Sequence, residues 1–343
     1  MSAAARCLDG PPAGWSDLLA TDPGATPAHR PALWAALAGT LPGMEARFVA
    51  VEEHGFLEGG MPVLVERRAG FRWLHALPFL LPGAPLARAG GHARVDRVAA
   101  ATLAVLQHEL GVVGGEWALY RPGGPAVSAD ALERVTGETR VLEAALVDLG
   151  AGLEAARGRV DRKTRQEIRQ ARARLVFADE PGALEEAYAL HAAQSRAWRG
   201  HGPLPLELSR RLLLPAGDGL GPVARLFTAR HGEALLCAVL ALDHPREVMP
   251  WWSGAHPEAR RLHAFPFLLW SVVEWAHAAG RARVNLGASA GSGPVAAFKD
   301  SLGATALRYP VRWLDAQAAP LAGRLLGAVQ ARWRRGRARG EAA

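Results

Sequence analysis

Alternating apolar and polar residues predict a β-hairpin in each half of the chain, at 47–65 and 226–242, and each hairpin turns at a His-Gly pair. Downstream of each hairpin, a pattern with helical period (96–110 and 265–279) ends just before a glycine and leads into a short strand pattern. The same order of elements therefore recurs after about half the length of the chain. This repetition predicts two copies of one α+β unit.

The second copy predicts a longer series of elements than the first. A chain-breaking stretch comes after the first copy, so we expect an N-terminal tail at 1–28, a first domain at 29–125, a second domain at 126–315 and a basic helix or tail at 316–343. Each domain is expected to hold a mixed, mostly antiparallel sheet flanked by helices. In the second domain the patterns predict helices at 159–175, 182–198, 265–279 and 295–302, strands at 223–230, 234–242, 246–253, 283–289 and 305–313, and a glycine-rich loop at 291–294.

The composition is that of a globular protein rather than a disordered or membrane-spanning one. The 343 residues are 50% hydrophobic and 21% charged, and the sequence shows neither a run of about 18 apolar residues nor a secretory signal. We therefore expect a cytoplasmic location. The two cysteines, Cys7 and Cys237, lie far apart in the sequence. Their spacing excludes a disulfide scaffold and a cysteine-based zinc site, and we expect no metal.

Arginine supplies almost all of the positive charge. The chain has 40 basic and 33 acidic residues, a formal net charge of +7, and Lys163 and Lys299 are its only lysines. Asn285 is likewise its single asparagine. This bias is typical of a GC-rich gene, in which arginine readily replaces lysine. A lysine that persists in this background indicates that a compact ammonium is needed there, because a guanidinium is a planar fork.

Lys299 comes directly after Phe298 on the predicted helix 295–302, one turn beyond the glycine-rich loop. A loop with Gly291 and Gly293 that opens a helix presents free backbone N–H groups, which suit an anionic or carbonyl oxygen. In an enzyme that acylates amines, the ammonium of Lys299 would neutralise the oxyanion of a tetrahedral intermediate, and Phe298 would stack on a base or pack on the acyl carrier. The alternative is a surface lysine beside a core phenylalanine, with a tight strand-to-helix turn.

Two familiar motifs overlap this loop, and the rest of the chain argues against both. G-x-S-x-G at 287–291 has the spelling of a serine-hydrolase elbow, but that fold places its histidine downstream and the last histidine here is His277. G-x-G-x-x-A at 291–296, with Asp315 further on, has the spacing of a dinucleotide fingerprint. Too few residues remain after Asp315 for the further βα units that a dinucleotide-binding fold needs.

A row of arginines predicts a phosphate-binding helix face. Arg162, Arg165, Arg169 and Arg172 are spaced so that they share one face of the predicted helix 159–175. The surrounding segment holds eight basic and two acidic residues, an excess that a solvated face does not need and that phosphate would balance. The alternative is an ordinary solvated face.

Two further features are candidates for binding. Trp252 ends a predicted strand, where it would line an acyl or base pocket; core packing is the alternative. The basic residues at 332–339 would contact nucleic acid or an anionic membrane surface, and a disordered solubilising tail is the alternative.

Several stretches are distinctive as a set: Asp161-Arg-Lys-Thr-Arg-Gln-Glu-Ile-Arg-Gln-Ala, Trp251-Trp-Ser-Gly-Ala, Glu274-Trp-Ala-His-Ala-Ala-Gly, Val284-Asn-Leu-Gly-Ala-Ser and Val295-Ala-Ala-Phe-Lys-Asp-Ser-Leu-Gly. Together they resemble the FemABX-like, peptidyltransferase-type branch of the GNAT acyltransferase superfamily over residues 140–313. The resemblance implies an α+β fold of two tandem GNAT-like domains, the first degenerate and the second an acyltransferase.

The resemblance also implies an activity and roles for particular residues. Members transfer an amino acid from aminoacyl-tRNA to an amine, in cell-wall precursors or small metabolites, or act as N-acyltransferases with other carriers. By resemblance, Lys299 stabilises the transition state and Phe298 contacts the acceptor end of the tRNA. Arg165 and Arg169 correspond to residues that meet a phosphate-bearing acceptor.

One departure from the superfamily pattern affects the choice of acyl donor. The glycine-rich coenzyme A loop before the central helix is replaced by Arg260-Arg-Leu-His-Ala-Phe-Pro, so acetyl-CoA is not the expected donor. We therefore expect an N-acyltransferase with aminoacyl-tRNA as co-substrate and no tightly bound cofactor. Its acceptor would be the amine of a small molecule or cell-wall precursor, and DNA is not an expected partner. Two alternatives stay open: the same fold using an acyl-CoA or acyl-carrier thioester in polysaccharide or lipid biosynthesis, and a non-catalytic RNA-binding module.

Overall fold

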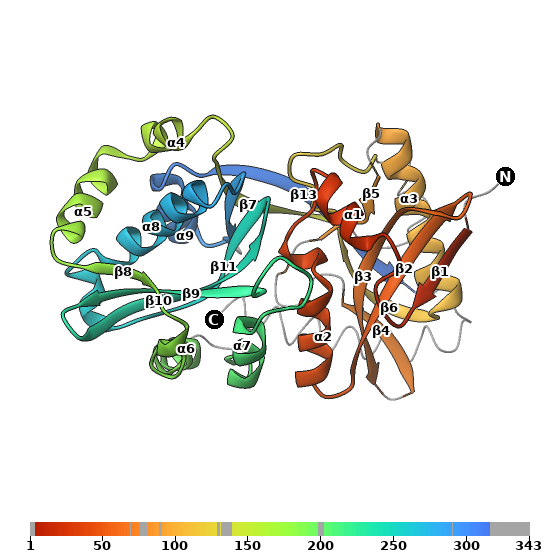
Figure 1. Ribbon diagram of the computed structural model, residues 1–343, viewed down its shortest axis with the longest axis horizontal. Coiled ribbons are helices and arrows are strands. Elements are labelled where there is room, and N and C mark those ends of the chain that lie inside the picture. Colours follow the sequence, from red (N-terminus) through yellow and green to blue (C-terminus); the bar gives the residue numbers. More distant parts are fainter. Residues whose placement is uncertain are drawn as a thin grey trace.

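A single mixed sheet runs through both halves of the molecule (Figure 1). The computed structural model describes residues 4–68, 70–75, 81, 83–88, 91–128, 131, 139–197, 202–289 and 291–315. The strand order is β1-β2-β3-β4-β6-β13-β7-β12-β11-β10-β9-β8, with β5 beside β3. The strands are β1 (Ala4–Leu8), β2 (Met44–Glu53), β3 (Phe56–Arg68), β4 (Phe71–His75), β5 (Leu86–Ala87), β6 (Val112–Ala118), β7 (Thr139–Asp148), β8 (Val176–Asp179), β9 (Ala224–His231), β10 (Ala234–His244), β11 (Glu247–Ala255), β12 (Arg283–Ala288) and β13 (Thr305–Asp315).

Helices cover both faces of this sheet. In the C-terminal half, α4, α5, α8 and α9 lie on one side of the strands and α6 and α7 lie on the other (Figure 1). The α-helices are α1 (Trp15–Thr21), α2 (Pro31–Thr40), α3 (His92–Ala104), α4 (Leu153–Arg159), α5 (Arg162–Arg172), α6 (Leu184–Ala197), α7 (Leu206–Leu213), α8 (Ala264–Ala278) and α9 (Gly293–Ser301). The 3₁₀ turns η1 (Pro27–His29), η5 (Pro181–Ala183) and η6 (Pro257–Arg260) and the π-helix η3 (Val105–Glu109), which continues α3, complete the described elements.

The two repeated units predicted from the sequence are confirmed. Strands β2, β3 and β4, helix α3 and strand β6 form one unit, and β9, β10, β11, α8 and β12 form the other. In each unit the third strand pairs in parallel with the strand after the crossover helix, β4 with β6 and β11 with β12. The first hairpin turns on His54 and Gly55, both with left-handed backbone (φ 53° and 79°), as a two-residue hairpin turn requires.

Two features of the fold differ from the expectation. Within the expected tail at 1–28, the described residues from 4 onward are folded: β1 pairs with β2, and Trp15 of α1 is buried and donates a hydrogen bond to the carbonyl of His29. The short α1 lies between proline- and glycine-rich stretches, which hide its periodicity. The two domains also share one sheet, because β13 pairs with β7 along one edge and with β6 along the other.

Arg30 holds the two halves together. Its side chain has no exposed surface, and its guanidinium donates to both carboxylate oxygens of Asp218 at 3.0 and 2.8 Å. The same group donates to the carbonyls of Gly221, Pro222 and Asp243 at 2.7 to 2.9 Å. An N-terminal arginine therefore finds all these partners in the C-terminal half. Beside it, leucines of α2 and α7 pack into one apolar cluster.

We expect Arg30→Met to lower the free energy of unfolding by about 3 kcal/mol, because Asp218 and the buried carbonyls would lose their donors. The matched control is Arg6→Met, because the Arg6 side chain is 57% exposed and pairs with Glu52. That variant should cost less than about 1 kcal/mol. Urea unfolding of the two variants measures the difference, and equal costs would contradict the structural role of Arg30.

Candidate functional site

The candidate site lies where β11 and β12 end. These parallel strands pair at Glu247 with Arg283 and at Val248 with Val284, and the pairing stops there although both strands continue. Helix α8 begins after β11 and α9 begins after β12. The strands therefore diverge toward their carboxyl ends, the position at which α/β proteins place their ligands.

Lys299 lies at the centre of this region. Lys299 projects from the last turn of α9 and is 8% exposed. Its ammonium donates to the carbonyls of Gly287 at 2.9 Å and Ala288 at 2.7 Å. Burial is the cause that lowers its pKa from 10.5 to about 8, since the interior disfavours the charged form. An ammonium has three N–H donors, so two are used by the protein and one is left for a ligand.

The glycine-rich loop joins the strand end that binds Lys299 to the start of α9. Gly291 and Gly293 are exposed, and α9 begins at Gly293. Lys299 comes six residues later, about 9 Å along the helix axis. Its ammonium donates to the carbonyls at the end of β12, where the loop starts.

Phe298 is half-buried and stacks on Phe265, with ring centroids 5.8 Å apart and an interplanar angle of 27°. Phe265 belongs to the first turn of α8, so this ring pair joins the start of α8 to α9. Phe298 also packs against the apolar cluster beneath α8. The ring of Phe298 is thus packed against the core and Phe265, and part of the residue stays exposed.

Arg165 and Arg169 are exposed on α5, and the structure records no side-chain partner for either within the described residues. Arg172 of the same helix differs, because it forms an ion pair with Glu274. The opposite face of α5 is buried by Thr164, Ile168 and Ala171, as the predicted helix face requires. The two free guanidinium groups are therefore available to an anionic ligand.

Helix α5 lies beside α8 and brings these arginines near the start of α8. Glu167 of α5 approaches His263, the residue before α8, at 3.8 Å. His263 has a left-handed backbone (φ 52°), a conformation that glycine adopts with less strain. The loop before α8 therefore makes the turn without the glycines of a coenzyme A loop, and it carries an exposed Arg260 instead.

Trp252 does not line this site, which corrects the expectation. It is 6% exposed, its indole N–H donates to Ser209 at 3.2 Å, and its ring stacks on His191. These partners come from α7 and α6, on the face of the sheet opposite α8. Adjacent residues of a strand point to opposite faces, and a sequence pattern does not say which face holds the site.

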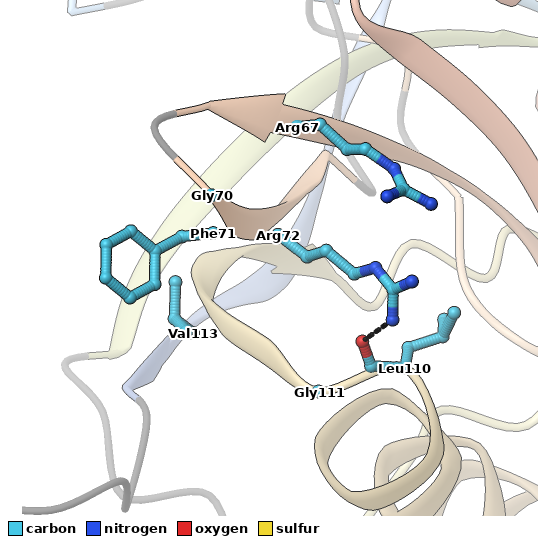
Figure 2. A pocket seen from close by; sticks show the side chains of 7 residues that line it. All are labelled: Arg67, Gly70, Phe71, Arg72, Leu110, Gly111 and Val113. Carbon is cyan, nitrogen blue, oxygen red and sulfur yellow. Dashed lines mark hydrogen bonds between the residues drawn. The ribbon is translucent and has the colours of Figure 1, made fainter.

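A cavity of about 290 Å³ lies elsewhere, in the N-terminal half at the start of β4 and β6 (Figure 2). The guanidinium groups of Arg67 and Arg72 extend to one side of it, and the ring of Phe71 turns to the other. Both arginines already have protein partners, Glu45 and the carbonyl of Leu110 respectively. The lining residues are Arg67, Gly70, Phe71, Arg72, Leu110, Gly111 and Val113.

The described part of the chain offers neither a metal cluster nor a membrane-spanning helix. It holds no group of three or more His, Cys, Asp or Glu side chains placed to bind a metal ion. None of the helices described has both the length and the apolarity needed to cross a bilayer. The basic stretch at 332–339, expected to contact nucleic acid or a membrane surface, lies outside the described residues.

Comparison with known proteins supports the fold. Residues 155–300 match the family model "Acetyltransferase (GNAT) domain". The fold is similar to that of FemX (10% identity, TM-score 0.67, covering 89% of this chain and 96% of that one). It is also similar to the C-terminal domain of an assigned lysylphosphatidylglycerol synthetase from Agrobacterium fabrum (15% identity, TM-score 0.54, covering 92% of this chain and 94% of that one). A tandem GNAT protein from the clavulanic acid biosynthesis pathway is a further match (15% identity, TM-score 0.51, covering 93% of this chain and 100% of that one). No curated protein sequence matches the chain.

The low pKa of Lys299 predicts how this amine reacts with an acylating label. Because only the neutral amine reacts, labelling of Lys299 should rise with a midpoint near pH 8 rather than near the ordinary lysine value of 10.5. Lys163, whose side chain is 89% exposed, is the internal standard that shows whether the label is active at each pH. Mass spectrometry of the two peptides across pH 6 to 11 measures the midpoint. A Lys299 midpoint above pH 10 would show that the amine is solvated.

Proposed function

We propose that this chain, whose residues 155–300 match a GNAT acetyltransferase domain model and whose fold is similar to that of FemX, transfers an aminoacyl group from aminoacyl-tRNA to an amine. The observation that carries the proposal is a buried ammonium with one free donor, at the divergent ends of β11 and β12. The free arginines of α5 next to this region supply the counter-charge for a phosphate backbone.

In the proposed reaction Lys299 acts in one step, the formation of the tetrahedral intermediate. The neutral acceptor amine attacks the ester carbonyl, and the carbonyl oxygen becomes an oxyanion, which the third N–H of the Lys299 ammonium stabilises. The new C–N bond is kept when the tetrahedral intermediate collapses, and the C–O bond to the ribose breaks. The proton lost by the amine ends on the ribose hydroxyl, so the atoms and electrons balance without an oxidant or a reductant.

The loop before α8 supports a tRNA donor over a coenzyme A thioester. The GNAT pattern uses glycines there to wrap a pyrophosphate, and this chain has a strained His263 and bulky neighbours. The acceptor amine belongs to a small molecule or a cell-wall precursor.

A thioester donor is the second candidate, and one observation favours it. Arg260 and Arg261 are exposed immediately before α8, where a carrier phosphate would meet both their guanidinium groups and the helix N-terminus. Thermal stabilisation of the protein by coenzyme A alone would favour this candidate. Stabilisation by tRNA alone would favour the first.

Lys299→Met should reduce aminoacyl transfer at least about 100-fold, because one preorganised oxyanion donor is lost while the aliphatic volume is kept. Transfer of radiolabelled amino acids from a charged tRNA pool to a set of primary amines measures the effect. Lys163→Met is the matched control and should retain activity, because Lys163 lies exposed on α5. If Lys299→Met kept full activity while folded, the proposed mechanism would be refuted.

Replacing Arg165 and Arg169 together by alanine should weaken tRNA binding. The slope of log K against the logarithm of the salt concentration should become shallower by about two, because two phosphate contacts are removed. A control with the same change of charge is Arg210→Ala with Arg211→Ala on α7, where both arginines pair with glutamates. Filter binding of tRNA at several salt concentrations compares the two double variants. Equal slopes would place the tRNA away from α5.

A further inference from the structure

Hydrogen bonds connect the N-terminal half of the molecule to β12, the strand whose carbonyls accept from the ammonium of Lys299. Tyr120, which lies just beyond β6, donates through its hydroxyl to Glu247 of β11 at 2.9 Å. Asn285 of β12 donates its amide N–H groups to the Tyr120 hydroxyl at 3.0 Å and to Glu247 at 3.1 Å. Tyr120, Glu247 and Asn285 each have 0% exposed surface. The group is therefore closed to solvent.

The other end of the Asn285 amide points along β12 toward Lys299. Its carbonyl oxygen accepts the backbone N–H of Gly287 at 2.8 Å. Gly287 has a left-handed backbone (φ 77°), and its carbonyl and that of Ala288 receive the ammonium of Lys299. Two bonds at the amide nitrogen and one at the oxygen leave the side chain a single orientation.

The backbone ladder does not fix Gly287 by itself. The register between β12 and β7 shifts between Asn285 and Ala288, so β12 leaves its regular pairing at this point. The side chain of Asn285 supplies the hydrogen bond that the ladder lacks. A carboxamide suits this position because it donates on one side and accepts on the other, whereas a carboxylate would face Glu247 with like charge.

We propose that Asn285, oriented by Glu247 and Tyr120, is a positioning residue that sets the two carbonyls to which Lys299 is bound. The N-terminal half then takes part in the reaction through the Tyr120 hydroxyl, although it carries none of the groups that touch the reacting atoms. This inference rests on the proposed role of Lys299 in acyl transfer.

The charged groups around α9 either bond to partners other than Lys299 or are exposed, so they do not account for the lowered pKa of Lys299. Arg159 donates to the carbonyls of Gly303 and Asp148, and Glu143 of β7 pairs with Arg308. Asp300, next to Lys299 on α9, is exposed. Burial against the end of β12 therefore governs the reactivity of the amine.

Tyr120→Phe removes one hydroxyl from this group without a change of charge, and Asn285→Ala removes the whole amide. The matched control is Tyr309→Phe, because Tyr309 is buried against Tyr120 with ring centroids 5.2 Å apart and has no side-chain hydrogen bond recorded to the described residues. In both test variants, relaxation of the strand end would admit water to Lys299. The midpoint of its acylation should then rise from near pH 8 toward 10.5.

A rise of one pH unit in that midpoint lowers the neutral fraction of Lys299 at pH 8 from about a half to about a tenth, which is about a fivefold loss of labelling. Transfer by Asn285→Ala should fall about tenfold in kcat with KM unchanged, because the substrate is still bound. Tyr309→Phe should change neither quantity.

A folded Tyr120→Phe variant whose Lys299 labels as in the original protein would overturn the proposal, even if Asn285→Ala fails to fold. The labelling needs no substrate, so it decides independently of the proposed function. If Lys299→Met retained transfer while the Tyr120→Phe midpoint moved, the positioning would stand and the catalytic role of Lys299 would fall.

Discussion

A carboxylate without access to water must find its hydrogen-bond donors inside the protein, and the arrangement of the two halves depends on how Glu247 does so. Burial raises the pKa of Glu247, and the donors that oppose this effect come from Arg283, Asn285 and Tyr120. Arg283 in turn donates to the carbonyl of Pro23 in the N-terminal half. A slip of one half against the other would take Tyr120 away from Glu247 and the Pro23 carbonyl away from Arg283, and would leave buried polar groups without partners, which is costly. The polar junction therefore specifies a single docking of the two units.

The two repeats have the same topology, but their last strands lead into different segments. In the N-terminal unit, β6 runs into Tyr120, which is buried and bonds to Glu247 of the other half, and then into Arg121, which is buried against Asp22. In the C-terminal unit, β12 leaves its ladder at Asn285 and continues into the glycine-rich loop and α9. One strand end thus contributes to the junction between the halves, and the other leads to the proposed site.

Local periodicity in the sequence predicted the helices and strands. It did not predict the contacts between residues that lie far apart in the sequence. The hairpins, the crossover helices and the arginine face of α5 result from periods of two and 3.6 residues, and they are found where predicted. The partners of β13 and the face of β11 that carries Trp252 depend on residues far away in sequence. Glu247 was missed because a glutamate at the start of a strand has the pattern of a surface residue. Asn285 left a signal, as the single asparagine, but its role needs the positions of Tyr120 and Glu247.

The persistence of a lysine at 299, in a chain where all but two of 40 basic residues are arginine, has a physical reason in this site. A guanidinium spreads five donors over a rigid plane and stays charged at any accessible pH. Two adjacent carbonyls at the end of β12 offer acceptors for two donors, and the remaining guanidinium N–H groups would be buried without partners. An ammonium leaves one donor, aimed by the two bonds already made. With a pKa of about 8, the amine is protonated over neutral by about ten to one at pH 7, so the donor that the proposed mechanism requires is present at neutral pH.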